Sequence, residues 1–326
     1  MKVLYAIQGT GNGHVARARE IVPVLEQMCD LDLLISGIQA DGSISQPIKS
    51  RYKGMSFIFG KKGGVDIWET YRKNRLFRIW RELQDFPAKD YDLVINDFEP
   101  ISAWAAKLSG VRCVSLSHQC AVLAPEAPKP ENSDPLGKAV LQHYTPTSEQ
   151  YGFHFERYSS KVYTPVIRRE VRGLETSNKG HYTVYLPAYS DEWLLKSLKQ
   201  FPEVKWEVFS RHNKQPRREG GVHIQPVNND KFVKSLVSSE GMLCGAGFEA
   251  PAEALFLNKK VLAIPMKGQY EQHCNAAGLK QLGVPVIPAL TPAYYDTIRN
   301  WLEQPWNIQV DYPDEVQGIL EDILGR

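Results

Sequence analysis

The chain lacks any apolar run close to the roughly 20 residues that a membrane-spanning helix needs. Its five cysteines are scattered, odd in number and never spaced as CxxC, which argues against a disulfide framework and favours reduced thiols in a cytoplasmic protein. Because Met1-Lys2 leads directly into an apolar run, we expect no signal peptide. A net charge of +2 indicates no particular charged partner. We therefore expect a cytoplasmic globular protein, and attachment to a membrane surface stays open.

Short apolar runs alternate with helical patterns along the 326 residues, a length that suits two domains. In the first half we predict strands at residues 3–7, 31–35, 56–59, 93–95 and 111–116, with helices at 15–28 and 101–108. In the second half we predict strands at 183–186, 206–209, 222–225, 241–244 and 261–264, and helices at 192–200, 230–238, 248–256, 272–282, 293–303 and 314–324. Such alternation implies right-handed crossovers and a parallel sheet in each half.

We place the domain boundary near Thr164-Pro165, so residues 1–164 form the first α/β domain and residues 165–310 the second. Residues 311–326 carry the last helical pattern. After Ser117 the pattern weakens, and the prolines of residues 125–135 predict a loop-rich stretch that serves as a lid or acceptor loop. The expected fold class is α/β, with two doubly wound, Rossmann-like domains that face each other.

Two glycine-rich segments each follow an apolar run and precede a helical pattern. They are Gly9-Thr10-Gly11-Asn12-Gly13-His14 and Gly245-Ala246-Gly247. A strand, a tight glycine turn and a helix point backbone N–H groups and a positive helix end at an anionic ligand. We therefore assign Gly11 and Gly13 to ligand binding, and place the chemistry in a cleft between two nucleotide-binding-type domains.

The first glycine segment is not the dinucleotide fingerprint, because His14 stands where that motif has its third glycine. The run 31–35 also ends in Ser36-Gly37, without the acidic residue that binds a ribose. A dehydrogenase is therefore not expected. The alternative is a glycine turn that serves only tight packing of strand against helix.

His14 and Asp97 each follow a predicted strand, at the edge where open α/β sheets bind ligands. A histidine there can act as a general base, and a carboxylate bonded to its imidazole fixes the tautomer and raises basicity. His14 could instead bind substrate or cap its helix, and Asp97 could be the N-cap of the helix that starts near Pro100. Glu99 and His118 are weaker candidates at similar positions.

A carboxylate and an amide pair follow the second glycine segment. Glu253 comes six residues after Gly247, inside the predicted helix, where a carboxylate can accept both hydroxyls of a ribose while the preceding N–H groups hold phosphates. Gln272 and Asn275 lie three residues apart, on one face of the next helix.

This pattern resembles the donor site of GT-B glycosyltransferases, above all the inverting family of the bacterial peptidoglycan N-acetylglucosaminyltransferase (MurG-like) and the UDP-glycosyltransferases. The residues that carry the likeness are Gly247, Glu253, Pro265, Glu271-Gln272 and Asn275. The loop of residues 9–14 is similar to the family's Gly-Thr-Gly-Gly-His with one residue inserted. The segment of residues 164–169 is similar to the opening of the family's second domain, whose arginine meets the diphosphate; Arg168 is our choice and Arg169 the alternative.

The resemblance implies a GT-B fold in which the last helix packs back onto the first domain. It implies transfer of a sugar from a nucleotide-sugar, expected to be a UDP-sugar, to an acceptor hydroxyl with inversion. His14, supported by Asp97, would take the acceptor's proton. The N–H groups of Gly247 and Phe248 and the Arg168 side chain would stabilise the leaving diphosphate. Glu253 would hold the ribose, with Glu271 and Gln272 at the sugar hydroxyls.

Two absences shape the expected mechanism. Retaining GT-B enzymes carry an acidic residue eight positions before the glutamate that corresponds to Glu253. In this sequence that position is Gly245, which favours inversion. The Asp30-Leu31-Asp32 triplet matches a metal motif of the other glycosyltransferase fold but lies at a helix-to-strand turn, so we expect a solvated turn and no required metal. The family's glycine and proline after the glutamate are Asn258 and Lys260 here.

Residues 51–82 form a basic, aromatic segment with nine basic residues against three acidic ones, a local excess of six positive charges. Part of it has helical spacing and could lie on an anionic membrane face, bind a phosphorylated or lipid-diphosphate acceptor, or pack on the first domain. Nucleic acid is not expected as a partner, because the rest of the chain is not basic.

The expected acceptor is a sugar, a lipid-linked sugar or a small molecule, plausible in cell-envelope or capsular polysaccharide or glycolipid synthesis by family analogy. Two other functions fit the same scaffold: a nucleotide-sugar epimerase or hydrolase, which needs no acceptor, and a non-catalytic nucleotide-sugar-binding protein.

Overall fold

The computed structural model describes residues 1–10, 12–37, 44–53, 76–132 and 134–325. Gly11, the strand predicted at 56–59 and most of the basic segment 51–82 lie outside the described residues. The chain forms two compact units. Unit 1 comprises Met1–Ala127, Asn132–Arg168 and Pro313–Arg326, and unit 2 comprises Pro128–Glu131 and Arg169–Tyr312.

Unit 1 is built on a sheet of seven parallel strands in the order β3-β2-β1-β4-β5-β6-β7. Their bounds are Lys2–Gln8 (β1), Asp30–Ser36 (β2), Ser50–Tyr52 (β3), Leu93–Asp97 (β4), Cys113–Ser117 (β5), Glu149–Phe153 (β6) and Val162–Tyr163 (β7). The central strands β1 and β4 are buried on both faces, which explains why they read as continuous apolar runs. Because the chain goes from β1 to β2 on one side and to β4 on the other, the strand order reverses between β1 and β4.

The helices of unit 1 cover both faces of this sheet. They are α1 (Asn12–Met28), α3 (Leu76–Asp85), α4 (Pro100–Ser109), α5 (His118–Leu123), α6 (Pro135–Tyr144) and α13 (Val316–Leu324), with a short 3₁₀ helix, η1, at Ala88–Asp90. One core cluster joins Leu4, Ala6 and Val94 of the sheet to apolar residues of α3 and α4.

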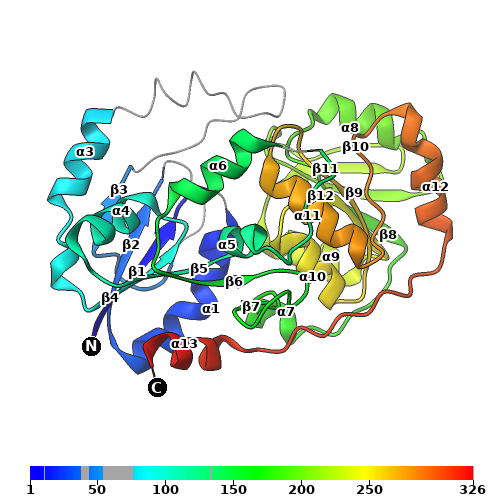
Figure 1. Ribbon diagram of the computed structural model, residues 1–326. Helices are drawn as coiled ribbons and strands as arrows, with labels where there is room; N and C mark the ends of the chain where they lie inside the picture. The colour runs from blue at the N-terminus through cyan, green and yellow to red at the C-terminus, as the bar shows by residue number, and fades with distance from the viewer. Residues whose placement is uncertain (11, 38–43, 54–75, 133, 326) are drawn as a thin grey trace. The chain divides into compact units, whose positions relative to one another are not determined.

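The last helix of the chain belongs to unit 1. Figure 1 shows α13, in red, beside α1, in blue, and the two helices are in contact. The Arg112 guanidinium donates to the Ile323 carbonyl at 3.0 Å, and the Tyr151 hydroxyl donates to the Asp322 carboxylate at 2.8 Å. Because Arg112 directly precedes β5 and Tyr151 lies on β6, these bonds attach α13 to the sheet of unit 1.

Unit 2 has a second sheet in the order β10-β11-β9-β8-β12-β13, parallel except for the edge strand β10. Its strands are His181–Tyr185 (β8), Lys205–Ser210 (β9), Arg217–Glu219 (β10), Val222–Pro226 (β11), Gly241–Gly245 (β12) and Lys260–Ile264 (β13). Its helices are Arg169–Arg172 (α7), Asp191–Leu198 (α8), Asn229–Ser238 (α9), Glu249–Phe256 (α10), Tyr270–Gln281 (α11) and Tyr295–Glu303 (α12), with a 3₁₀ turn, η2, at Pro292–Tyr294. Here the strand order reverses between β8 and β12.

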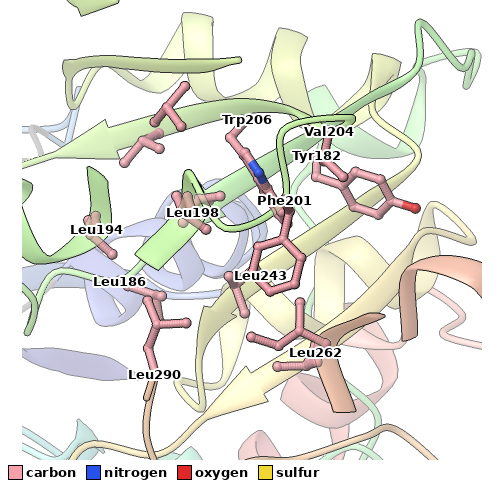
Figure 2. Packing of buried hydrophobic residues seen from close by; sticks show 14 of the residues in the cluster. Tyr182, Leu186, Leu194, Leu198, Phe201, Val204, Trp206, Leu243, Leu262 and Leu290 are labelled. Atoms are coloured by element: carbon pink, nitrogen blue, oxygen red, sulfur yellow. The ribbon is translucent and has the colours of Figure 1, made fainter. Parts of the chain in front are cut away.

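The core of unit 2 is rich in aromatic and leucine side chains (Figure 2). Trp206 of β9 packs against Phe201 and Tyr182, with ring centroids 6.0 and 5.6 Å apart, and Trp301 of α12 packs against Tyr182 at 5.0 Å. Each unit therefore has its own apolar core, as a doubly wound domain requires.

The loop-rich stretch predicted from the prolines of residues 125–135 lies where it was expected. The structure places α5 directly after β5 and begins α6 at Pro135, and the described residues between these helices, 124–132 and 134, form no helix or strand. Ser117 caps α5 and Asp134 caps α6 through their side-chain oxygens. Among the described residues, no helix is both long and apolar enough to cross a membrane.

Candidate active site

In unit 1 the reversal of strand order brings the ends of β1 and β4 together. Ile7 of β1 lies opposite Asp97, the last residue of β4. After β1 the chain turns through the glycine segment into α1, whose third residue is His14. Ligands of open α/β sheets bind at this place, outside the carboxyl ends of the strands where the order reverses.

Three side chains converge there in a buried ionic cluster. His14 Nδ1 lies 2.8 Å from Asp97 Oδ1. Arg17 Nη2 donates to both Asp97 oxygens, at 2.7 Å to Oδ1 and 2.9 Å to Oδ2, and Arg17 Nε donates to Oδ2 at 3.1 Å. The Asp97 carboxylate is fully buried and Arg17 is only 3% exposed. The carboxylate is therefore held by two partners at once.

The cluster keeps Asp97 ionised. Burial alone would raise the pKa of Asp97, but the charge of Arg17 and the bonded His14 imidazole outweigh it and lower the pKa below the ordinary carboxyl value. Burial and then the nearby Asp97 charge raise the pKa of the Tyr5 phenol well above its usual range. An ionised carboxylate can only accept, so the His14 Nδ1 that lies beside it carries a proton.

The imidazole of His14 is enclosed by further side chains. Phe98 stacks on it with ring centroids 6.4 Å apart, and the Gln119 amide nitrogen lies 3.5 Å from His14 Nε2. Phe98 has a positive φ of 59°, a strained conformation for a bulky residue that is often found at functional sites. The ring is thus fixed in orientation, with Nε2 on the side of α5.

The N-cap interpretation of Asp97 is wrong, because Glu99 caps α4. The Glu99 carboxylate accepts from the backbone N–H groups of Ile101 and Ser102, at 2.9 and 2.6 Å, and from the Ser36 hydroxyl at 2.6 Å. Glu99 is fully buried, and burial raises its pKa in spite of these bonds. It is committed to the helix start, which leaves it badly placed to act as a base.

His118, the other weaker candidate, is buried in the first turn of α5. Its Nδ1 lies 2.8 Å from the Phe153 carbonyl oxygen, and its ring is 5.3 Å from that of His154. The structure gives it a structural hydrogen bond to β6.

In unit 2 the second glycine segment lies at the other reversal of strand order, directly after β12. Gly247 has open space around it: a Cβ atom added there would meet no atom within 4 Å. Phe248 is the N-cap residue of α10 and its side chain makes no capping hydrogen bond. The positive end of α10 therefore follows an uncrowded glycine, as an anion site requires. Glu253 lies one turn into α10 and is 4% exposed.

Two amides of α11 bond to nearby backbone, Asn275 to the glycine turn and Gln272 to the segment after β13. The Gln272 carbonyl oxygen accepts from the Met266 N–H at 2.8 Å, and the Asn275 amide donates to the Ala246 carbonyl at 3.1 Å. Asn275 is fully buried. Asn275 thus supports the glycine turn from behind, while Glu271 and Gln272 are only partly buried in the first turn of α11.

The remaining predicted ligand residues lie in different parts of the chain. Gly13, in the first turn of α1, is partly buried next to His14. Arg168 is a buried residue at the end of unit 1, and Arg169 is exposed at the start of α7 in unit 2. Arg168 therefore belongs to unit 1 and the α10 turn to unit 2.

The described residues contain no group of three or more metal-ligating side chains. Asp30 and Asp32 stand at the amino end of β2, whereas ligands of such sheets bind at the carboxyl ends of the strands. Asp32 forms an ion pair with Lys49, with 2.5 Å between Oδ2 and Nζ.

Arg17, Gln119 and Tyr5 surround the His14–Asp97 pair and were not found from the sequence. A signal existed for Arg17: it shares the buried stripe of α1 with His14, Ala18 and Ile21, where a charged residue needs a partner. No comparable signal marks Gln119, whose contact depends on where α5 lies.

Comparison with known proteins agrees with this architecture. Residues 1–302 match the model of Glycosyl transferase family 1. A search of curated proteins gave no match.

The fold is shared with solved glycosyltransferases of low sequence identity. Spinosyn forosaminyltransferase SpnP has a TM-score of 0.64 at 13% identity, with both chains covered completely. MurG of Acinetobacter baumannii has a TM-score of 0.59 at 16% identity, covering 100% of this chain and 99% of that one. A UDP-N-acetylglucosamine 2-epimerase has a TM-score of 0.58 at 13% identity, covering 100% and 96%.

The predicted α/β fold with two doubly wound domains is confirmed by the full-length agreement with GT-B structures. The family match extends over most of the chain, and glycosyltransferases are prominent among the similar structures. The chain therefore belongs to Glycosyl transferase family 1 and is a glycosyltransferase with the GT-B fold, which transfers sugar from a nucleotide-sugar donor.

Proposed function

We propose that this enzyme transfers the sugar of a UDP-sugar to an acceptor hydroxyl by a single inverting displacement that requires no metal. The acceptor oxygen attacks the anomeric carbon as its proton passes to His14 Nε2. The bond between that carbon and the diphosphate breaks, and UDP leaves with the electron pair. The observation that carries the proposal is the buried 2.8 Å contact of His14 with an ionised Asp97 at the switch point of unit 1.

Unit 2 supplies the donor site in this proposal. The open space at Gly247 and the N-terminus of α10 suit a diphosphate, and Glu253 would accept the two ribose hydroxyls. Arg168, or Arg169, adds positive charge to the leaving group, and Glu271 and Gln272 contact the sugar hydroxyls. Gly245 stands eight residues before Glu253, so no carboxylate occupies the place of the retaining enzymes' acid, which supports inversion.

The acceptor is proposed to be a sugar, a lipid-linked sugar or a small molecule of cell-envelope or capsular synthesis. A basic face of residues 51–82 would bring the enzyme to an anionic membrane surface. In the described part of that segment, Trp80 of α3 is 58% exposed and Arg81 beside it is exposed, as expected for such a contact.

The donor site is tested by thermal unfolding with UDP, TDP, GDP and CMP. A ligand at about 100 times its Kd stabilises the folded state by about 2.7 kcal/mol. We expect selective stabilisation by UDP that disappears in Glu253→Ala.

Gly247→Ala should keep the unliganded melting temperature, because its methyl group meets no protein atom. The same variant should lose the UDP response, because the methyl group would occupy the space of the diphosphate. Gly318→Ala is the matched control: its methyl group is equally unobstructed, on α13 of unit 1.

The base is tested by kinetics once an acceptor is found. His14→Ala should lower kcat by about 100-fold or more with little change in the donor KM, whereas Glu253→Ala should mainly raise that KM. Near-normal kcat in His14→Ala would show that the base is elsewhere. Absence of any nucleotide response would refute the donor site.

A nucleotide-sugar epimerase is the second candidate, because an epimerase shares this fold. Release of an epimer or of free sugar from the donor without an acceptor would favour it over transfer.

A further inference from the structure

Arg17 is a buried charged residue at the site that has no role in the proposed transfer. It sits one turn after His14 on α1, is 3% exposed, and makes three hydrogen bonds to one carboxylate. Its Nη2 also lies 3.2 Å from His14 Nδ1, and its guanidinium carbon lies 5.6 Å from the centre of the Phe153 ring.

We propose that Arg17 is a positioning residue for catalysis, which fixes Asp97 in its charged form and whose own charge opposes protonation of His14 by solvent. The inference rests on the proposed function in one respect, that His14 is the base. It adds a determinant of the pH range in which the enzyme works.

The first step concerns geometry. Asp97 Oδ1 accepts hydrogen bonds from both His14 Nδ1 and Arg17 Nη2. The guanidinium group therefore fixes the orientation of the same oxygen that binds the imidazole. A planar guanidinium with Nε and Nη2 on two oxygens is a rigid clamp, which an ammonium cannot reproduce. If Arg17 were absent, the carboxylate would be buried with a single partner, and its rotamer and charge would be less defined.

The second step concerns charge. With Arg17 present, its positive charge and the negative charge of Asp97 cancel, so the cluster of the three residues is neutral while the His14 imidazole is neutral. Protonation of His14 then gives the cluster one net positive charge. Without Arg17 the same proton would take the cluster from one negative charge to neutrality. Inside a protein the second change is far more favourable than the first. Arg17 therefore keeps the imidazole unprotonated to lower pH, and it helps the proton leave after each transfer.

Other groups that face His14 do not replace this charge. Asp97 approaches from β4 and Tyr5 from β1, and burial raises the pKa of the Tyr5 phenol so far that it stays neutral. From α5 comes the neutral amide of Gln119, whereas the Cys120 thiol, whose pKa is raised by burial, donates to the carbonyl oxygens of Ser117 and Tyr151. Arg17 is the one cation among these described neighbours of the imidazole.

The experiment compares Arg17→Gln, which removes the charge, with Arg17→Lys, which keeps it without the fork. Arg19→Gln, an exposed arginine on the same helix, is the matched control. Two quantities are measured: the pH profile of kcat/KM, and the pH midpoint of the His14 ring resonances by nuclear magnetic resonance in the absence of substrate. The His14 signal is identified by its loss in His14→Gln.

For Arg17→Gln we expect kcat to fall about 10-fold or more while the donor KM is kept. We also expect the acid limb of kcat/KM and the ring midpoint to move up by about one pH unit. Arg17→Lys should return both midpoints towards wild type with only part of kcat, and Arg19→Gln should change neither. A purely structural arginine would lower the active fraction without moving a midpoint.

The result that overturns the inference is a ring midpoint in Arg17→Gln that is unchanged or moves down. The resonance measurement needs no turnover, so it separates the two proposals. If the midpoint moves up but His14→Gln keeps its kcat, the Arg17 inference on charge holds and the assignment of the base fails.

Discussion

Asn258 has a positive φ of 54°, in the left-handed region that favours glycine. It follows the C-cap residue of α10, Leu257. The N–H of Asn258 bonds to the Leu255 carbonyl at 2.9 Å, and the N–H of Lys259 bonds to the Ala254 carbonyl at 2.9 Å, the two bonds of a Schellman motif. The resemblance places a glycine here, and asparagine is the residue that next tolerates this conformation.

We predict that Asn258→Gly is neutral or stabilises the protein slightly, whereas Asn258→Ala destabilises it by about 1 kcal/mol. The reason is that the Cβ atom of alanine disfavours the left-handed conformation and alanine has no polar side chain that could form a compensating local hydrogen bond. The free energy of unfolding in urea measures both. Leu108→Ala, at an exposed position of α4, serves as a control for a substitution that makes no change in backbone preference. Equal stability of the glycine and alanine variants would contradict the argument.

At the residue scale, the positions of single site residues along the chain could be predicted better than the side chains that contact them. His14 and Asp97 could be placed at strand ends by counting from apolar runs, and parallel strands put their carboxyl ends at one edge. The clamp of Arg17 on Asp97 could not be predicted, because it needs the register of β1 against β4 and the rotation of α1. Glu99 was misjudged for a similar reason: which acid caps α4 depends on the turn at Phe98.

At the element scale, the strands with apolar runs were predicted to within about two residues, from β1 and β2 to β12 and β13. The described strands that the sequence did not predict are β3, β6, β7 and β10. They lie at or next to an edge of their sheet, where part of the strand is exposed and the apolar signal is weak. The start of α6 carried a usable signal, since Asp134 followed by Pro135 is an N-cap before a proline at the first helical position.

The helix α13 gives the prediction that belongs to this scale. Its buried stripe includes Ile319 and Leu320, which are almost fully buried in unit 1. We expect Ile319→Ala to destabilise unit 1 by about 2–5 kcal/mol, since it removes buried methyl groups and leaves a cavity. The exposed Gln317→Ala on the same helix is the control. Calorimetry should show a lower transition temperature for Ile319→Ala alone, and an unchanged transition would mean that α13 does not stabilise unit 1.

At the scale of the whole molecule, the chain consists of two units with separate cores, and the cysteines are distributed between them. Cys113 and Cys120 are buried in unit 1, and Cys244 and Cys274 are buried in unit 2, while Cys29 is partly exposed. Burial raises the pKa of Cys113 to about 12 and that of Cys244 to about 12. Because the thiolate is the reactive form, the four buried thiols react only when their unit opens.

We therefore predict that thiol labelling, followed by mass spectrometry of each cysteine, reports the opening of each unit separately. Cys29 should react first. UDP at about 100 times its Kd should slow the labelling of Cys244 and Cys274 by up to about 100-fold, because the proposed donor site lies in unit 2 and would have to release the nucleotide before that unit opens. Cys113 and Cys120 should keep their rates, and Glu253→Ala should abolish the protection. Equal slowing of all four buried thiols would show instead that the two units open together, so that the nucleotide stabilises the molecule as one cooperative body.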